Sequence, residues 1–229
     1  MDKQLKVVAR MRSDFPQKFG IPRQSGLVEE LRGQIVFEPE FRSPDALRGI
    51  EGFSHLWLIW GFSANEREDW SPTVRPPRLG GNERIGVFAT RSPFRPNGLG
   101  LSCVRLEKVE LQGPDGPVLH VSGGDLMDGT PIYDVKPYVP YADCRPEAAE
   151  GFASRPVEPL RVEFPGQWLD EVPRSQREAL VGVLAQDPRP RYQDDPQREY
   201  GMAFGGLNVR FTVDGEVLTV TGIERKRET

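Results

Sequence analysis

The feature that most restricts the fold is a succession of short strand-like segments in residues 1–142, separated by turn residues. The apolar patterns predict strands at residues 3–12, 34–38, 55–62, 84–90, 99–111 and 118–121. Residues 113–117 have the composition of a turn, so the last two strands are expected to form a hairpin. Hairpin-linked strands with little helix favour a mainly β, barrel-like antiparallel domain over a doubly wound α/β fold.

Three segments of this first domain allow more detailed predictions. Ser43 followed by Pro44 is typical of a helix start, with the serine as N-cap. Residues 55–62, HLWLIWGF, are apolar without strong alternation and predict a strand buried on both faces. Residues 65–83 are largely polar and contain three prolines, which predicts a long loop.

The composition changes near Tyr141, and residues 143–229 are expected to form a small α+β domain. Residues 143–155 are polar and poor in strand formers, which is typical of a linker. Apolar residues at helical spacing predict a helix over 173–186. Residues 208–213 and 216–221 flank Asp214-Gly215, a strong signal for a two-residue hairpin.

The charge distribution indicates a specific anionic partner rather than general nucleic-acid coating. The net charge is −4, yet residues 75–105 contain six arginines and one acid, Glu83. An arginine-rich solvated loop is the alternative interpretation. The chain has two cysteines, no signal-peptide pattern and no apolar run of the roughly 20 residues that a membrane span needs. We therefore expect a cytoplasmic protein without a membrane segment.

The stretch DLMDGTPIYDVKPY, residues 125–138, contains three carboxylates, Asp125, Asp128 and Asp134. Carboxylates can bind a ligand or coordinate magnesium, but their spacing matches no calcium loop. Asp128-Gly129-Thr130-Pro131 is also a good turn in its own right. No histidine lies nearby, and we assign no metal site.

Residues that often act in catalysis are scarce elsewhere in the chain. The only histidines, His55 and His120, lie in strand-like runs and are expected to be structural. Cys103 also lies in a strand pattern and is interpreted as a small apolar residue. The sequence contains neither a nucleophile elbow nor a phosphate-binding loop.

Taken together, six motifs resemble the TrmO family of S-adenosylmethionine-dependent tRNA methyltransferases. They are PRQ at 22–24, HLW at 55–57, RPPRLGG at 75–81, GVFATRSPFRPNGLGLS at 86–102, DLMDGTPIYDVKPY at 125–138 and DPRPRY at 187–192. The resemblance implies a non-Rossmann, barrel-like methyltransferase domain, a small C-terminal domain and a homodimer. It implies methylation of N6 of N6-threonylcarbamoyladenosine at position 37, beside the anticodon of a threonine tRNA.

The resemblance also implies which residues bind S-adenosylmethionine: Pro22, Arg23, Gln24, Ser63, Ala64, Arg91, Leu101, Asp125, Leu126, Met127 and Asp128. At residues 63–64 the family often has a histidine, so a contact made there by this chain is expected to use the backbone. Methyl transfer from a sulfonium requires alignment and no metal, which agrees with the unassigned metal site.

The turn RSPFRPNGLGLS, residues 91–102, is expected to bind an anionic part of the tRNA through Arg95 and Asn97, since arginine binds phosphate and carboxylate groups. The alternative is a structural turn whose arginines pair with acids of the barrel. In the C-terminal domain, Arg189, Arg191 and Tyr192 are expected to contact tRNA. Truncation near residue 143 is expected to leave cofactor binding largely intact and to abolish tRNA methylation.

The candidate catalytic residues are Tyr133, Asp134 and Lys136. The target N6 belongs to a urea, so its lone pair is delocalised and a general base would assist the reaction. An aspartate is ionised at neutral pH, and Asp134 is the preferred base, with Lys136 on the same face if the segment is extended. A structural Asp134–Lys136 pair is the alternative. Two other functions also remain open: a nucleotide-binding regulatory module without turnover, and a metal-dependent hydrolase.

Overall fold

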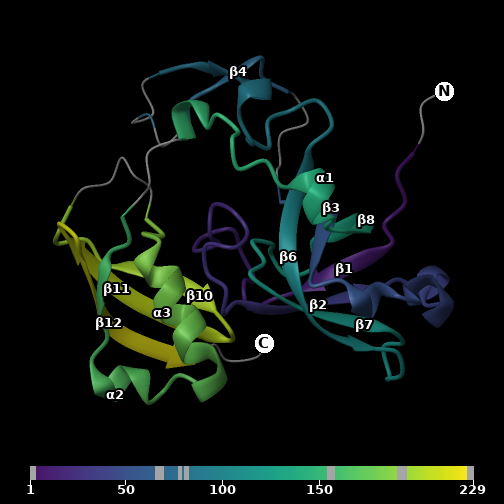
Figure 1. Cartoon of the computed structure of the whole chain (residues 1–229). Coiled ribbons are helices and arrows are strands. Elements are labelled where there is room, and N and C mark those ends of the chain that lie inside the picture. The colour runs from purple at the N-terminus through teal and green to yellow at the C-terminus, as the bar shows by residue number, and fades with distance from the viewer. Residues whose placement is uncertain are drawn as a thin grey trace.

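The fold is known from a computed structural model, which describes residues 4–64, 70–76, 79, 83–153, 158–189 and 195–225 (Figure 1). Six strands form a closed antiparallel barrel in the order β1-β2-β7-β6-β3-β8. Their bounds are β1 (Ala9–Arg12), β2 (Arg32–Phe37), β3 (His55–Gly61), β6 (Leu99–Glu110), β7 (Val118–Ser122) and β8 (Pro131–Pro137). The predicted mainly β, barrel-like antiparallel domain is confirmed.

The barrel core is filled by inward-facing apolar residues from its strands, among them Leu56, Leu58 and Trp60 of β3. The structure differs here from the prediction of a strand buried on both faces. His55 of β3 is exposed and Trp57 is half-buried. A strand in a closed barrel has one face inside and one outside, so alternate residues are buried even where the outer positions are also apolar.

The segment before the arginine-rich turn also differs from its prediction. Instead of a strand over 84–90, the chain forms β5 (Ile85–Gly86), paired with β4 (Thr73–Val74), and then a 3-10 turn at Val87–Ala89. The side chain of Phe88 is 73% exposed. Because β5 pairs with β4 in a separate two-stranded sheet, and Val87 is buried from a 3-10 turn, the segment does not extend the barrel sheet.

The predicted helix after Ser43 is a short 3-10 helix, Pro44–Leu47, and the Ser43 side chain makes no capping bond. Other short helices lie in connections: 3-10 helices at Pro39–Phe41, Ile50–Gly52 and Gly151–Ala153, and α1 (Pro140–Asp143). In the part of the chain that the structure describes, no helix has the length and apolar character needed to cross a membrane.

The C-terminal part contains α2 (Gly166–Leu169), α3 (Arg177–Ala185) and a sheet in the order β10-β11-β12-β9. The strands are β9 (Arg161–Glu163), β10 (Tyr200–Phe204), β11 (Leu207–Asp214) and β12 (Val217–Arg225). The hairpin at Asp214-Gly215 is confirmed. The helix predicted over 173–186 is a 3-10 turn, Arg174–Gln176, followed by α3.

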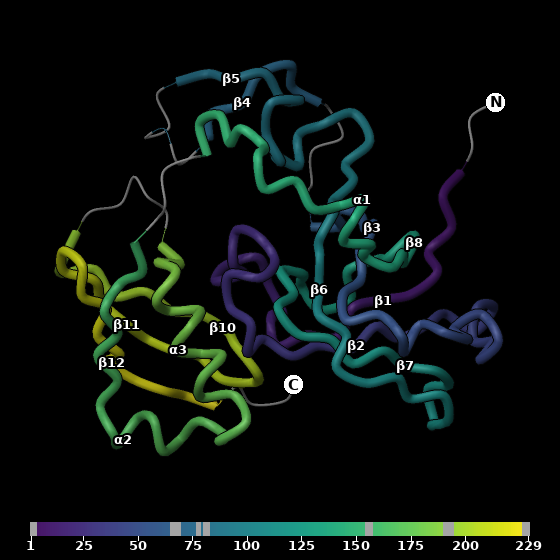
Figure 2. The backbone as a smooth tube through the Cα atoms, viewed as in Figure 1, coloured from purple at the N-terminus to yellow at the C-terminus, as the bar shows by residue number. Residues whose placement is uncertain are grey.

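The hydrophobic core of the C-terminal part contains three residues from the first part of the chain, Phe15, Val28 and Leu31. They belong to residues 13–31, the connection between β1 and β2. In Figure 2 this connection lies between the barrel and the C-terminal part of the chain, which contains β10 and α3. Residues 13–31 therefore lie between the barrel and the C-terminal sheet and contact both.

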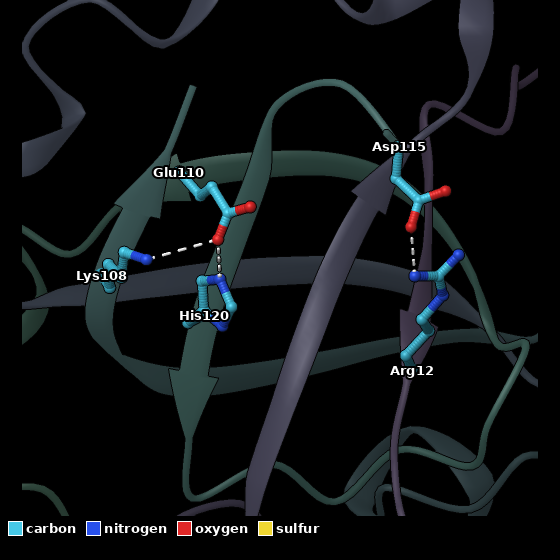
Figure 3. Close-up of polar contacts among 5 residues, drawn as sticks. All are labelled: Arg12, Lys108, Glu110, Asp115 and His120. Atoms are coloured by element: carbon cyan, nitrogen blue, oxygen red, sulfur yellow. Dashed lines mark hydrogen bonds and ion pairs between the residues drawn. The ribbon is translucent and has the colours of Figure 1, made fainter. Parts of the chain in front are cut away.

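Polar side-chain contacts on the outer surface of the barrel join neighbouring strands and turns (Figure 3). Glu110 accepts hydrogen bonds from His120, at 3.0 Å, and from Lys108, at 3.3 Å, and both bonds lower the pKa of the Glu110 carboxyl. Arg12 donates to Asp115 at 2.6 Å. His120 thus joins strands β6 and β7, which agrees with the structural role expected for it.

Candidate functional site

A cavity of about 480 Å³ lies where strands β3 and β6 meet the 13–31 connection and the arginine-rich turn. This volume falls within the range of small-molecule sites, roughly 300–1,000 Å³. The cavity is lined by Lys18, Ile21, Pro22, Arg23, Gln24, Trp60, Gly61, Phe62, Ser63, Ala64, Thr90, Arg91, Pro93, Arg95, Leu99, Gly100, Leu101, Asp125, Met127 and Thr130.

Most of the residues predicted to bind the cofactor line this one cavity, although they come from four separate stretches of the chain. They are Pro22, Arg23, Gln24, Ser63, Ala64, Arg91, Leu101, Asp125 and Met127. Leu126 instead points into the barrel core, where it is 1% exposed. Asp128 is not part of the lining, and its carboxylate accepts a bond from the backbone N–H of Ser13 at 3.1 Å.

Several lining residues were not predicted. Trp60, Gly61 and Phe62 belong to a run that the sequence indicated only as a buried strand. The apolar character of Ile21 and Leu99 does not distinguish a cavity wall from a core position. For Ile21 and Phe62 the available signal was proximity along the chain to Pro22 and Ser63, and for Leu99 it was a position within the motif at residues 86–102.

A chain of hydrogen bonds links the cavity to the barrel core through Asp125. The indole N–H of Trp60 donates to Ser102 Oγ at 2.9 Å, and the Ser102 hydroxyl donates to Asp125 Oδ1 at 2.6 Å. Burial raises the pKa of the Asp125 carboxyl, while bonds from Ser102 and from backbone N–H groups, and the charge of Arg91, oppose this rise. The cavity therefore contains a desolvated carboxylate of fixed orientation, which favours a cationic ligand group.

Arginine side chains form a cationic part of the cavity wall. The guanidinium of Arg91 donates to Gln24 Oε1, joining the arginine-rich turn to the 13–31 connection. Arg95 donates to the carbonyl oxygens of Thr90, at 3.1 Å, and Ser92, at 3.3 Å. Arg95 thus bonds the backbone of its own turn, rather than the barrel acids of the structural interpretation, and also lines the cavity; its contact with tRNA stays a prediction.

Tyr133, Asp134 and Lys136 lie on β8, outside the cavity lining. A bulge pairs Ile59 with Asp134 but Trp60 with Ile132. Ile132 is in the barrel core and Val135 packs against it, so Asp134 and Lys136 both face outward. They form an ion pair with 3.0 Å between Nζ and Oδ2, as expected for residues two apart on one face.

Although Asp134 does not line the cavity, the strand pairing places it close to a residue that does. Asp134 pairs with Ile59, and Ile59 pairs on its other side with Leu101, which lines the cavity. Paired residues project from the same face of a sheet, and strands lie about 4.8 Å apart, which places Asp134 about 10 Å from Leu101. The ring of Tyr133 lies against the cavity residue Gly61.

Besides Arg95, the predicted tRNA-binding residues that the structure describes fall in two different environments. Asn97 is exposed in the arginine-rich turn. The side chain of Arg189 is 11% exposed and is paired with Asp187 at 3.0 Å. Arg191 and Tyr192 lie outside the described residues.

The three carboxylates considered for metal binding do not come together at one site. Within the described ranges, no group of three or more histidine, cysteine, aspartate or glutamate side chains has an arrangement that could hold a metal ion. Asp125 faces the cavity, Asp128 bonds the Ser13 backbone and Asp134 lies on the outer face of β8. The geometry therefore gives no support to the hydrolase alternative.

Comparisons with known proteins relate the whole chain to a family of tRNA methyltransferases. The chain is 39% identical to the tRNA (adenine(37)-N6)-methyltransferase of Escherichia coli, over 96% of this chain and 97% of that protein. It is 37% identical to a protein of Pyrococcus abyssi described as a probable S-adenosyl-L-methionine-binding protein, over 65% of this chain and 74% of that one. The crystal structure of TrmO from Pseudomonas aeruginosa superposes with a TM-score of 0.81 at 35% identity, covering 99% of this chain and 98% of that one.

The sequence also matches two family descriptions. Residues 10–144 match the tRNA-methyltransferase O N-terminal domain, and residues 157–226 match the TrmO C-terminal domain. The first match covers the barrel except for Ala9, together with every cavity-lining residue, and the second covers the C-terminal sheet. The chain therefore belongs to the TrmO family.

Proposed function

We propose that this protein is a tRNA methyltransferase that transfers a methyl group from S-adenosylmethionine to N6 of N6-threonylcarbamoyladenosine at position 37 of a threonine tRNA. The observation that carries the proposal is that residues expected to bind the cofactor, far apart in the sequence, line one cavity. The names of the similar proteins, which include a tRNA (adenine(37)-N6)-methyltransferase and an S-adenosyl-L-methionine-binding protein, support it.

The walls of the cavity fit S-adenosylmethionine in charge and polarity. The oriented carboxylate of Asp125 suits a cationic or hydroxyl group of the ligand, and Arg91 and Arg23 suit its carboxylate. Trp60 and Phe62 offer aromatic surface to the adenine. When bound, S-adenosylmethionine supplies an electrophilic methyl group; the residues of the chain hold and orient it.

The target nucleotide is proposed to lie across the outer face of β3 and β8, beside the cavity. There, Asp134 is the general base that accepts the N6 proton of the nucleotide. Lys136, ion-paired to it, steadies the carboxylate or binds the threonyl carboxylate. Tyr133, packed on Gly61, is proposed to lie between the cofactor cavity and the bound nucleotide. A general base of this kind contributes about 10²–10⁴-fold to the rate.

Binding of the remaining tRNA is assigned to Arg95 and Asn97 near the cavity, and to Arg189, Arg191 and Tyr192 in the C-terminal domain. The pair of exposed rings Trp70 and Phe88, stacked 6.5 Å apart beside the arginine-rich turn, supports an RNA-facing surface there. By family resemblance we also propose a cytoplasmic homodimer, with residues 1–142 as the catalytic domain and residues 143–229 as the C-terminal domain.

The proposal is tested by incubating the purified protein with S-adenosylmethionine and a threonine tRNA that carries N6-threonylcarbamoyladenosine. Mass spectrometry of the nucleosides is expected to show the methylated product, and the same tRNA without the threonylcarbamoyl group is expected to stay unmodified. Methylation of both substrates alike would contradict the substrate assignment.

Isothermal titration separates the proposal from the other two functions. We expect S-adenosylmethionine to bind with an affinity that EDTA does not change. Binding without any turnover on tRNA would favour a regulatory module, and binding that EDTA abolishes would favour the metal-dependent hydrolase. Sedimentation of the protein at micromolar concentration tests the homodimer.

A further inference from the structure

Residues 13–31, called here the connecting segment, bind the barrel on one side and the C-terminal domain on the other. On the barrel side, the Ser13 hydroxyl donates to the Leu126 carbonyl at 2.9 Å, and the Gly26 N–H donates to the Gly123 carbonyl at 2.9 Å. On the other side, Phe15 and Val28 are part of the C-terminal hydrophobic core. The segment is therefore held by both domains.

The cofactor-lining residues 22–24 lie between these two kinds of anchor. Phe15, Phe19 and Ile21, which precede them, all pack against the C-terminal core. The next contact after them is to the barrel, where the Ser25 hydroxyl oxygen accepts the N–H of Cys103 at 3.1 Å. One end of the cofactor wall is thus attached to the C-terminal domain.

Two close approaches fix the position of the segment on the C-terminal domain. Gly20 adopts φ +96°, and a β-carbon there would lie 2.2 Å from Met202 Sδ. Val28 packs on Gly182 of α3, where a β-carbon would lie 2.7 Å from Val28 Cγ1. Neither contact has room for a larger residue, so sliding of the segment over the domain surface is sterically restricted.

A polar anchor complements this packing at Asp14. Its carboxylate accepts a hydrogen bond from Gln176 Nε2 at 2.9 Å, and its carbonyl accepts one from the Gly205 N–H at 2.8 Å. Burial raises the pKa of the Asp14 carboxyl, and the Gln176 bond opposes the rise. Beside it, the rings of Phe15 and Phe204 meet edge to face at 5.3 Å.

We propose that the C-terminal domain positions the wall of the S-adenosylmethionine site, with Gln176, Gly182 and Met202 as positioning residues that act through the connecting segment. None of the three lines the cavity. This inference rests on the proposed function, since it takes S-adenosylmethionine as the ligand. It gives the C-terminal domain a role in cofactor affinity in addition to contact with tRNA.

The test uses the full chain with Gln176→Glu, which places a second carboxylate against Asp14 in nearly the same volume. S-adenosylmethionine affinity, measured by titration calorimetry, is expected to fall at least tenfold. Hydrogen exchange of the amides of residues 18–24, measured without cofactor, is expected to accelerate. The double variant Asp14→Asn with Gln176→Glu reverses donor and acceptor and is expected to restore both readouts.

Two further variants keep the result interpretable. Gly182→Ala presses on Val28 without changing any charge and is expected to weaken cofactor binding in the same way. Val213→Ala is the matched control, because Val213 belongs to the same core but pairs with Leu218 beside the far hairpin turn. It should lower the melting temperature without changing cofactor affinity.

The outcomes distinguish this inference from the proposed function. If the unmodified protein does not bind S-adenosylmethionine, the proposed function fails, while the exchange of residues 18–24 still reports whether the C-terminal domain holds them. If the unmodified protein binds and the Gln176 and Gly182 variants bind equally well, the inference is overturned. It is also overturned if the Val213 control loses affinity in proportion to its stability.

Discussion

At the scale of single residues, Asp125 combines a stability cost with the cofactor-binding role proposed for it. Because burial raises its pKa above the ordinary 3.8, the folded protein binds more protons than the unfolded chain between the two pKa values. Stability therefore falls as the pH rises through this window, and the cost persists at neutral pH. Such a cost is typical of a functional site, where a charge is held ready for a ligand.

We predict that Asp125→Asn keeps or raises the melting temperature at neutral pH and weakens S-adenosylmethionine binding at least tenfold. The amide can still accept the Ser102 bond but provides no negative charge for a cationic ligand. In the unmodified protein, affinity should fall as the pH is lowered towards the raised pKa, and the variant should lose this dependence. Titrations at several pH values test this; a parallel pH dependence in the variant would contradict it.

Asp134 differs from Asp125 because it lies on the outer face and is paired with Lys136. We predict that Asp134→Asn leaves S-adenosylmethionine affinity unchanged and lowers the single-turnover methylation rate at least a hundredfold. Asp115→Asn is the control, since Asp115 is also a surface aspartate in an ion pair, with Arg12. A loss below tenfold for Asp134→Asn would mean that the base lies elsewhere or that none is needed.

At the scale of elements, local turn chemistry and apolar patterns identified several strands but not their faces. The hairpin at Asp214-Gly215 was predictable because a two-residue turn of this composition permits few alternatives. The β8 bulge was not, because it depends on the pairing of Ile59 and Trp60 with residues more than 70 positions away. The strand predicted over 84–90 was wrong for most of its length, because Val87 is buried from a 3-10 turn and not from a sheet.

For the cavity too, residues within recognisable motifs were predictable, while residues brought in by the tertiary fold were not. Pro22–Gln24, Arg91 and Asp125 were identified from their resemblance to family motifs. Neighbours such as Lys18 and Ile21 reach the cavity only through the fold, and no local pattern distinguishes them. The connecting segment is a further case, since its apolar residues gave no indication that a second domain covers them.

The pairing of β3 with β6 allows a prediction about the contact between Trp60 and Gly100. Gly100 faces the indole of Trp60, and a β-carbon there would lie 2.3 Å from Trp60 Cε2. Gly100→Ala is expected to displace the indole, break its bond to Ser102 and destabilise the protein by about 1–3 kcal/mol, as overpacking commonly does. Cofactor affinity should fall with it, because Ser102 orients Asp125.

Chemical denaturation and calorimetry on the Gly100→Ala protein provide the measurement. Gly129→Ala is less suitable as a control because of its φ of +76°. Gly52→Ala is better, since nothing lies within 4 Å of a β-carbon there and its φ is not positive. Equal affinities in the Gly100 variant and the unmodified protein would show that the indole can move without disturbing Asp125.

At the scale of the whole molecule, the shared core changes what truncation is expected to do. The sequence suggested that a chain ending near residue 143 would keep cofactor binding. The structure shows Phe15, Val28 and Leu31 buried among residues of the C-terminal domain. Exposing three such side chains costs about 1.5–3 kcal/mol each, which is a large part of the 5–15 kcal/mol that stabilises a typical domain.

We therefore predict that a chain ending at Cys144 binds S-adenosylmethionine at least a hundredfold more weakly than the full chain. Loss of solubility could produce the same result, so the informative fragment also carries Phe15→Ser, Val28→Ser and Leu31→Ser, which removes the exposed apolar surface. This fragment should retain the barrel, measured by circular dichroism, because the barrel has its own core. It should still bind the cofactor weakly, since residues 22–24 lack their C-terminal anchor. Near full-length affinity in either fragment would show that the barrel alone orders the cofactor wall.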